Sequence, residues 1–159
     1  MGGPRGLTLI ELLLVCAVIG VVLVIVMPGL RVYRSTMALQ QARLQLISDV
    51  RIAREVALAR HRSVIVEFGD GVSTSNLTTY SILTDLNNNA QADPGEPFSS
   101  RTLPSGVSMS SALHPTDRLK FNARGLLAAG NSKGRLVLQV EHCPPETLNV
   151  SRVGMIYER

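Results

Sequence analysis

The amino-acid sequence predicts an α+β protein in which a long N-terminal helix packs on an antiparallel β-sheet or small β-sandwich. An apolar block fills residues 7–27, and a helical repeat of apolar residues follows it. Short β-prone runs separated by Gly, Pro, Asn and Ser occupy the remainder. With 159 residues, the chain has room for one small domain beyond the N-terminal block.

The block from Leu7 to Met27 is 21 residues long and has one charged residue, Glu11. A helix of that length reaches about 30 Å, the thickness of a bilayer's hydrocarbon core. A secretory signal peptide is shorter and ends in a small-residue cleavage site, which does not follow Val26. Arg5 precedes the block and keeps the N-terminus cytoplasmic by the positive-inside rule. The sequence therefore predicts a retained single-pass membrane helix.

Glu11 is the unusual residue of this block. A carboxylate inside the hydrocarbon costs on the order of 3 kcal/mol or more, so such a residue is usually functional. Two interpretations stay open: a charge tolerated near the interface, or a group that pairs with a cation at the same depth. Cleavage after Gly6 would create such a cation, the α-amine of Leu7, and adjacent staggered subunits of a filament could bring the two together.

The run from Arg5 to Val15 resembles the type IV prepilin cleavage and methylation motif, usually Gly-Phe-Thr-Leu-Ile-Glu before an apolar helix. The resemblance implies cleavage between Gly6 and Leu7 by a prepilin peptidase, N-methylation of Leu7, and use of Glu11 in subunit registration. Leu7 departs from the common Phe of the motif. The resemblance further implies a leader over residues 1–6, a bacterial inner-membrane location, and assembly with other pilins or pseudopilins into a filament. A membrane anchor without a filament would leave Gly6 and Glu11 unexplained.

Helical periodicity continues beyond the block over a stretch rich in helix formers. Its apolar members recur at three- and four-residue steps: Leu39, Ala42, Leu46, Val50, Ala53 and Ala57. Pro28 lacks a backbone donor and clashes with the preceding turn, so it either bends one helix or follows the end of a first helix at Met27. Pilins often carry a helix-kinking proline at this place, which implies an assembly role for Pro28. One helix from Leu7 to about His61 is predicted, transmembrane over residues 7–28 and an amphipathic stalk over residues 29–62.

Residues 63–159 are predicted to form a β-rich periplasmic head. The β-prone runs are Ser63–Phe68, Thr78–Thr84, Arg118–Asn122, Gly134–Glu141 and Met155–Glu158. Leu136, Leu138 and Val140 alternate with more polar positions, which indicates one buried sheet face for the stalk's apolar stripe to cover. The Ser-rich stretch Pro104–Pro115 is predicted to be a loop. Cys143 is predicted to be a half-buried thiol without a disulfide, because Cys16 lies in the membrane block.

Within the pilin superfamily, the chain resembles the GspH/FimT group of minor pilins and pseudopilins. The matching features are the stalk stretch Asp49 to Ala57, the loop Asp85 to Glu96, and Phe121-Asn122-x-x-Gly125 before a strand. The resemblance implies a low-abundance structural subunit with two β-sheets, at or near a filament tip. Two systems stay open. One is a type II secretion pseudopilus for protein export, and the other is a type IV pilus with a role in initiation, adhesion or DNA uptake.

The loop between residues 85 and 96 is a candidate calcium site. Oxygen-bearing side chains stand at positions 1, 3, 5, 9 and 12, as in an EF-hand loop: Asp85, Asn87, Asn89, Asp93 and Glu96. Ala90 replaces the usual Gly, and no flanking helices are predicted. The alternative is a polar connection in which Asn and Asp supply turn geometry. Calcium is the one cofactor that the sequence brings into consideration.

Charge placement bears on the remaining functional classes. The basic excess lies on the stalk, since residues 31–62 hold seven Arg against two acids, while residues 63–159 are near neutral. A local basic group on the head is the candidate nucleic-acid surface: Arg118, Lys120, Arg124, Lys133 and Arg135. Such charges between strands are more often a solvated face. The three His are far apart in the sequence, and no nucleophile motif or phosphate loop is present, so an enzyme is not expected.

Overall fold

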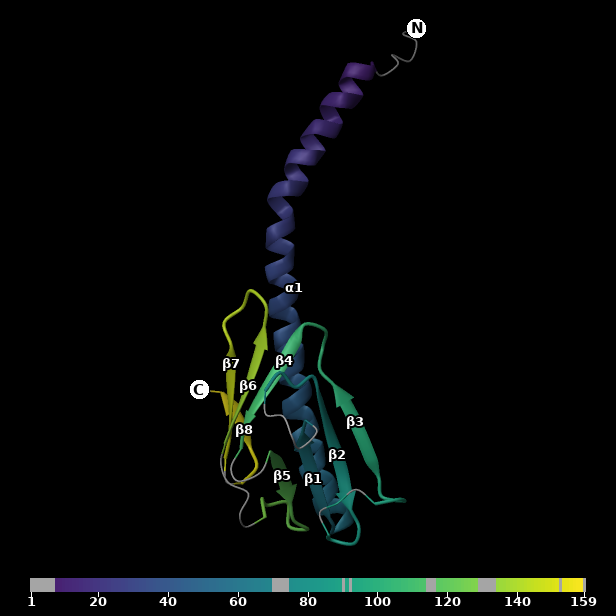
Figure 1. The fold of residues 1–159 in the computed structure, drawn as a ribbon, viewed down its shortest axis with the longest axis vertical. Helices are drawn as coiled ribbons and strands as arrows, with labels where there is room; N and C mark the ends of the chain where they lie inside the picture. The colour runs from purple at the N-terminus through teal and green to yellow at the C-terminus, as the bar shows by residue number, and fades with distance from the viewer. Residues whose placement is uncertain are drawn as a thin grey trace. The chain divides into compact units, whose positions relative to one another are not determined.

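The computed structural model describes residues 8–69, 75–89, 91, 93–113, 117–128, 134–151 and 153–158 (Figure 1). It contains one long helix, α1 (Leu9–Arg60), followed by strands that form two sheets. The strands are β1 (Ser63–Phe68), β2 (Thr79–Asp85), β3 (Phe98–Thr102), β4 (Val107–Ala112), β5 (Arg118–Phe121), β6 (Gly134–Val140), β7 (Glu146–Val150) and β8 (Ile156–Glu158). The chain divides into two compact units between Arg34 and Ser35. The predicted α+β class with a long N-terminal helix is confirmed.

The second half of α1 forms one side of the hydrophobic core. Every member of the predicted apolar stripe is buried: Leu39, Ala42, Leu46, Val50, Ala53 and Ala57. The helix ends as a Schellman motif, because His61 adopts a φ of 51° and the Arg62 N–H donates to the Ala57 carbonyl at 3.3 Å. This C-cap stops the helix one residue before the predicted end and turns the chain into β1.

All strand pairs are antiparallel. Sheet A has the order β3-β2-β1-β5, and sheet B has the order β4-β6-β7-β8. An isolated bridge between Leu77 and Met109 links the segment before β2 to β4. One core cluster contains residues of α1, of sheet A such as Phe68, and of sheet B such as Leu138. The two sheets and the helix therefore share a single core, as expected for one small domain.

Five of the strands match the predicted runs to within one residue at every boundary, and the other three, β3, β4 and β7, were not predicted. The loop prediction for Pro104–Pro115 is wrong, because β4 occupies Val107–Ala112 and pairs with β6. Val107, Met109 and Ser111 face inward and are buried, while intervening serines are partly exposed. The sequence analysis missed this strand because serine has little intrinsic β preference. The strand is stabilised instead by packing against cross-strand neighbours such as Leu138.

Candidate functional site

The start of α1 carries the one part of the predicted processing motif that the structure describes. Thr8 is the N-cap, since its Oγ1 accepts the Glu11 N–H at 3.3 Å and its carbonyl accepts the Leu12 N–H at 3.2 Å. Glu11 then lies in the first turn, where the helix dipole stabilises a negative charge. Thr8-Leu9-Ile10-Glu11 has the spacing of a capping box. The sequence analysis did not predict this cap, because it assigned the same residues to the prepilin motif.

The carboxylate of Glu11 keeps its acceptor capacity for other groups. The capping bond uses the backbone N–H of Glu11, and the residue is exposed. Capping therefore explains Thr8, while the side chain of Glu11 remains accessible to a cation. Gly6 and Leu7, the predicted cleavage and methylation residues, lie outside the described residues.

The first half of α1 presents apolar side chains outward on all sides. Its most apolar 18-residue window has a mean hydropathy of 3.2 with no part buried, so α1 is long and apolar enough to cross a membrane. A core helix would be mostly buried, and an exposed apolar surface of this kind requires lipid or other apolar chains. The helix continues through Pro28, so the alternative of a helix end at Met27 is wrong.

The candidate calcium loop connects β2 to β3 and is held by its own hydrogen bonds. The side-chain oxygens of Asn87 and Asn89 each accept the backbone N–H two residues later, at 3.0 and 2.8 Å. Asp93 Oδ2 accepts the side-chain amides of both asparagines at 2.6 Å, and Glu96 Oε1 accepts the Leu86 N–H at 2.8 Å. These are the turn bonds that Asn and Asp typically supply.

Asp85 stands apart from the other four calcium candidates. Its buried carboxylate lies 3.3 Å from Lys120 Nζ on β5. Within the described part of the chain, no group of three or more His, Cys, Asp and Glu side chains is arranged to hold a metal ion. A calcium ion in this loop would therefore have to replace hydrogen bonds that the loop already makes.

The basic residues of the head divide between the two sheets. Arg118 donates to Glu67 at 2.7 and 2.8 Å, and Lys120 pairs with Asp85. Arg124 is exposed in the turn after β5, whereas Arg135 is exposed on β6 of the other sheet. Lys133 lies outside the described residues. Because Arg118 and Lys120 are bound to carboxylates, fewer cations are available to phosphates than the sequence alone indicated.

A buried polar network joins α1 to sheet A, and the sequence analysis missed it. Tyr80 Oη donates to Asp49 Oδ2 at 2.6 Å, and Gln45 Nε2 donates to Tyr80 Oη and to the Thr102 carbonyl, both at 3.1 Å. Arg101 lies 3.6 Å from the same Asp49 oxygen. Burial, reinforced by the hydrogen bond to Asp49, raises the pKa of Tyr80 well above its usual range.

A second polar link joins α1 to sheet B. Arg43 donates to Glu146 of β7 at 2.9 Å, and Thr36 Oγ1 lies 3.5 Å from Cys143 Sγ. Cys143 is half-buried against the core and free, as predicted, and Cys16 is free as well. The amphipathic half of α1 is thereby fastened to both sheets.

A helix with an exposed apolar half and an amphipathic half buried by antiparallel sheets defines a pilin-like protein. A family model described as type II transport protein GspH matches residues 42–154. The chain therefore belongs to the GspH family. The proteins of this family are structural proteins and not enzymes.

Similar proteins agree with this assignment. The chain is 42% identical over 94 residues to pilin-like protein PilA1 of Thermus thermophilus, covering 59% of this chain and 56% of that protein. It thus spans little more than half the length of this relative. The type IV minor pilin FimU of Pseudomonas aeruginosa has a similar fold, with a TM-score of 0.59, 17% identity, and coverage of 80% of this chain and 92% of FimU.

The minor pseudopilin EpsH from the type 2 secretion system of Vibrio cholerae also has this fold. The TM-score is 0.53 at 13% identity, with 79% of this chain and 95% of EpsH covered. At such identities the likeness to FimU and EpsH establishes the fold alone.

Proposed function

We propose that this chain is a minor pseudopilin, cleaved after Gly6, N-methylated at Leu7 and assembled into a type II secretion pseudopilus for protein export. The exposed apolar half of α1, which begins within the prepilin motif, is the observation that carries this proposal. The GspH family match over residues 42–154 and the fold shared with EpsH support the secretion system.

In this proposal the chain has four functional segments. Residues 1–6 are the leader that the prepilin peptidase removes, and residues 7–28 are the inner-membrane span, with the N-terminus cytoplasmic. Residues 29–62 are the stalk, and residues 63–159 are the periplasmic head. Cleavage leaves Leu7 as the new N-terminus, one residue before the Thr8 cap and four before Glu11.

The chemistry of assembly follows from the charge of Glu11. In lipid, an unpaired carboxylate is costly, and the α-amine of Leu7 in an adjacent, staggered subunit is a cation at a matching depth. Pairing the two would make the filament the favourable environment for both charges. Because the N-cap bond uses the Glu11 backbone, Glu11→Gln leaves the helix start in place and removes only the charge.

The test uses the full chain expressed with and without a prepilin peptidase. We expect mass spectrometry to show peptidase-dependent loss of Met1 to Gly6 and a methylated Leu7. Glu11→Gln should be cleaved like the wild type but should be lost from sheared filaments, while Thr8→Ser, which keeps the capping hydroxyl, should be incorporated normally. An intact N-terminus beside an active peptidase would leave a plain membrane anchor as the explanation.

A minor type IV pilin is the second candidate, because FimU has the same fold and PilA1 is described as pilin-like. The two candidates differ in their filament partners. Co-assembly of the tagged chain with the pseudopilins of its own genome, compared with co-assembly with type IV pilins, separates them. A role in DNA uptake would in addition require phosphate binding by Arg124 and Arg135, the two candidate cations that are exposed without a carboxylate bond among the described residues.

A further inference from the structure

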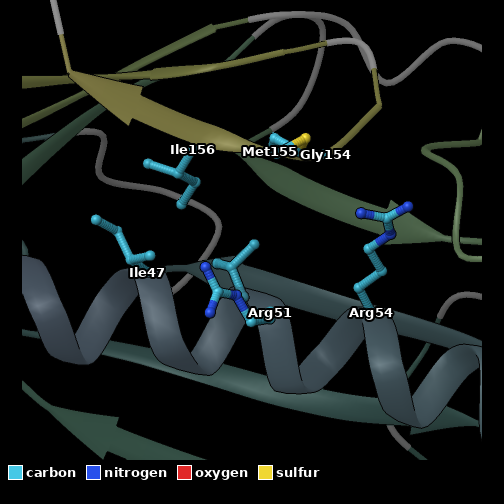
Figure 2. Close-up of a pocket in the computed structure, with 7 residues that line it drawn as sticks. Ile47, Arg51, Arg54, Gly154, Met155 and Ile156 are labelled. Carbon is cyan, nitrogen blue, oxygen red and sulfur yellow. The ribbon is translucent and has the colours of Figure 1, made fainter.

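A groove of about 80 Å³ lies between the second half of α1 and the turn that leads into β8 (Figure 2). Its helix side is formed by Ile47, Val50, Arg51 and Arg54, and its sheet side by residues 154–156. Figure 2 shows Ile156 pointing across the groove toward the helix, and both arginines projecting from the helix on its other side. The groove thus combines an apolar floor with two guanidinium groups.

The sheet side of the groove packs closely on the core and makes hydrogen bonds of its own. Gly154 has a φ of +75°, and a Cβ at this position would lie 2.3 Å from Phe121 Cε1, so the turn rests directly on the core. Three hydrogen bonds of 2.9–3.0 Å between Ser151 and residues 154–155 hold the turn closed. A binding surface that is already ordered loses little conformational entropy when a partner arrives.

The helix side carries donors that the head does not use. Among the described residues, Arg51 forms no hydrogen bond or ion pair, and it is exposed. Arg54 donates its Nε to the Gly125 carbonyl at 2.9 Å, and its two terminal nitrogens are further donors. Arginine at such a site favours carboxylate oxygens, which it can bind with two parallel hydrogen bonds.

The strand beside the groove is an edge. β8 ends the order of sheet B, and in the described part of the chain it pairs only with β7. An edge strand offers backbone groups to an extended segment, and adjacent side chains then select among sequences. Met155, which lines the groove, is more than half exposed, so apolar contact is available beside the two cations.

We propose that this groove binds an extended acidic segment of a neighbouring subunit, which adds to the edge of β8 and pairs its carboxylates with Arg51 and Arg54. The identity of the partner as a filament subunit rests on the proposed function, whereas the peptide chemistry does not. Nucleic acid fits the groove less well, because it needs many phosphate contacts and would leave the apolar floor unused.

The test measures binding of fluorescent, end-blocked hexapeptides to the full chain in detergent micelles. We expect a peptide of alternating Leu and Glu to bind, and peptides of alternating Leu and Lys or Leu and Gln to bind more weakly. Arg51→Glu should weaken binding of the Leu-Glu peptide about tenfold or more, since a hydrogen-bonded charge pair is lost and a repulsion is added. Arg51→Lys keeps the positive charge but not the planar guanidinium group, so its affinity for the Leu-Glu peptide should lie between those of the wild type and Arg51→Glu.

Arg60→Glu is the matched control, because Arg60 is exposed in the last turn of the same helix and lies outside the groove. Equal losses for Arg51→Glu and Arg60→Glu would overturn the proposal in favour of general charge attraction. A 12-nucleotide single strand that binds more tightly than the Leu-Glu peptide, with sensitivity to Arg51→Glu, would assign the groove to nucleic acid. Peptide binding by the unprocessed chain does not depend on cleavage, so the proposed function and this groove can fail separately.

Discussion

Among the single residues, the buried pair of Tyr80 and Asp49 shows how a charge is accommodated in this head. Asp49 lies on the flank of the buried helix face and would be costly there without partners. The phenol of Tyr80 donates to it at 2.6 Å, and Arg101 lies nearby. The network links α1 to β2 and satisfies the buried carboxylate in this position of the helix.

This pair makes stability depend on pH. The folded pKa of Tyr80 is raised above the unfolded value of about 10, so its contribution is complete below about pH 10 and is lost as the pH rises through the folded pKa. Tyr80→Phe should cost about 1.5–3 kcal/mol at neutral pH by removing a hydrogen bond to a charged group. Urea unfolding at pH 8 and pH 11 checks both effects: the wild type should lose more stability than Tyr80→Phe between the two pH values. An equal loss would show that Tyr80 does not carry the pH dependence.

Among the structural elements, turns decide how the strands meet the core. Gly106 and Gly154 both have a positive φ, of +82° and +75°, but only Gly154 lies against another side chain. A Cβ on Gly106 would meet nothing within 4 Å, whereas one on Gly154 would collide with the Phe121 ring. A substitution at Gly106 therefore tests backbone strain alone, whereas one at Gly154 tests backbone strain together with steric overlap.

Gly106→Ala should cost about 1–2 kcal/mol for a left-handed residue with a side chain. Gly154→Ala should cost about 1–3 kcal/mol more, because Phe121 or the β7–β8 turn must move. Denaturant midpoints of the two variants of the full chain in micelles measure the difference. Similar midpoints would mean that the turn gives way without disturbing the core.

For the chain as a whole, the residues that form the hydrophobic core and the residues of the apolar helix half lie in different segments. Every residue of the core cluster lies between Leu39 and Val150, within the compact unit that begins at Ser35. The apolar residues from Leu9 to Met27 are all outside that core. Residues 35–159 should therefore be able to fold without the first half of α1.

Deleting residues 1–34 tests this separation. Ser35 would supply a capping hydroxyl for the shortened helix, so we expect residues 35–159 to be soluble and to unfold cooperatively on heating. The full chain should sediment with membranes in the same assay. A fragment without a cooperative transition, followed by circular dichroism, would show that the first half of α1 contributes to folding as well as to anchoring.

Local spacing in the sequence was enough to predict the long helix, its apolar and amphipathic halves, and five strands. These features depend on spacings of two to four residues, and such spacings are readable without partners. The prepilin motif is equally local, and so is the Thr8 cap. The stripe from Leu39 to Ala57 was predicted residue by residue because burial on a helix follows its period.

Which polar residues meet, in contrast, depends on the tertiary fold. The strand at Val107–Ala112 depends on β6 for its packing, and the pairs Asp85–Lys120, Glu67–Arg118 and Asp49–Tyr80 join residues that are 31 to 51 positions apart. Two of these pairs bind the candidate basic residues Lys120 and Arg118 to carboxylates. The groove at Arg51 likewise exists only because the turn before β8 lies beside α1 in the fold. The free energy of a polar group depends on its spatial neighbours, and a linear sequence does not contain them.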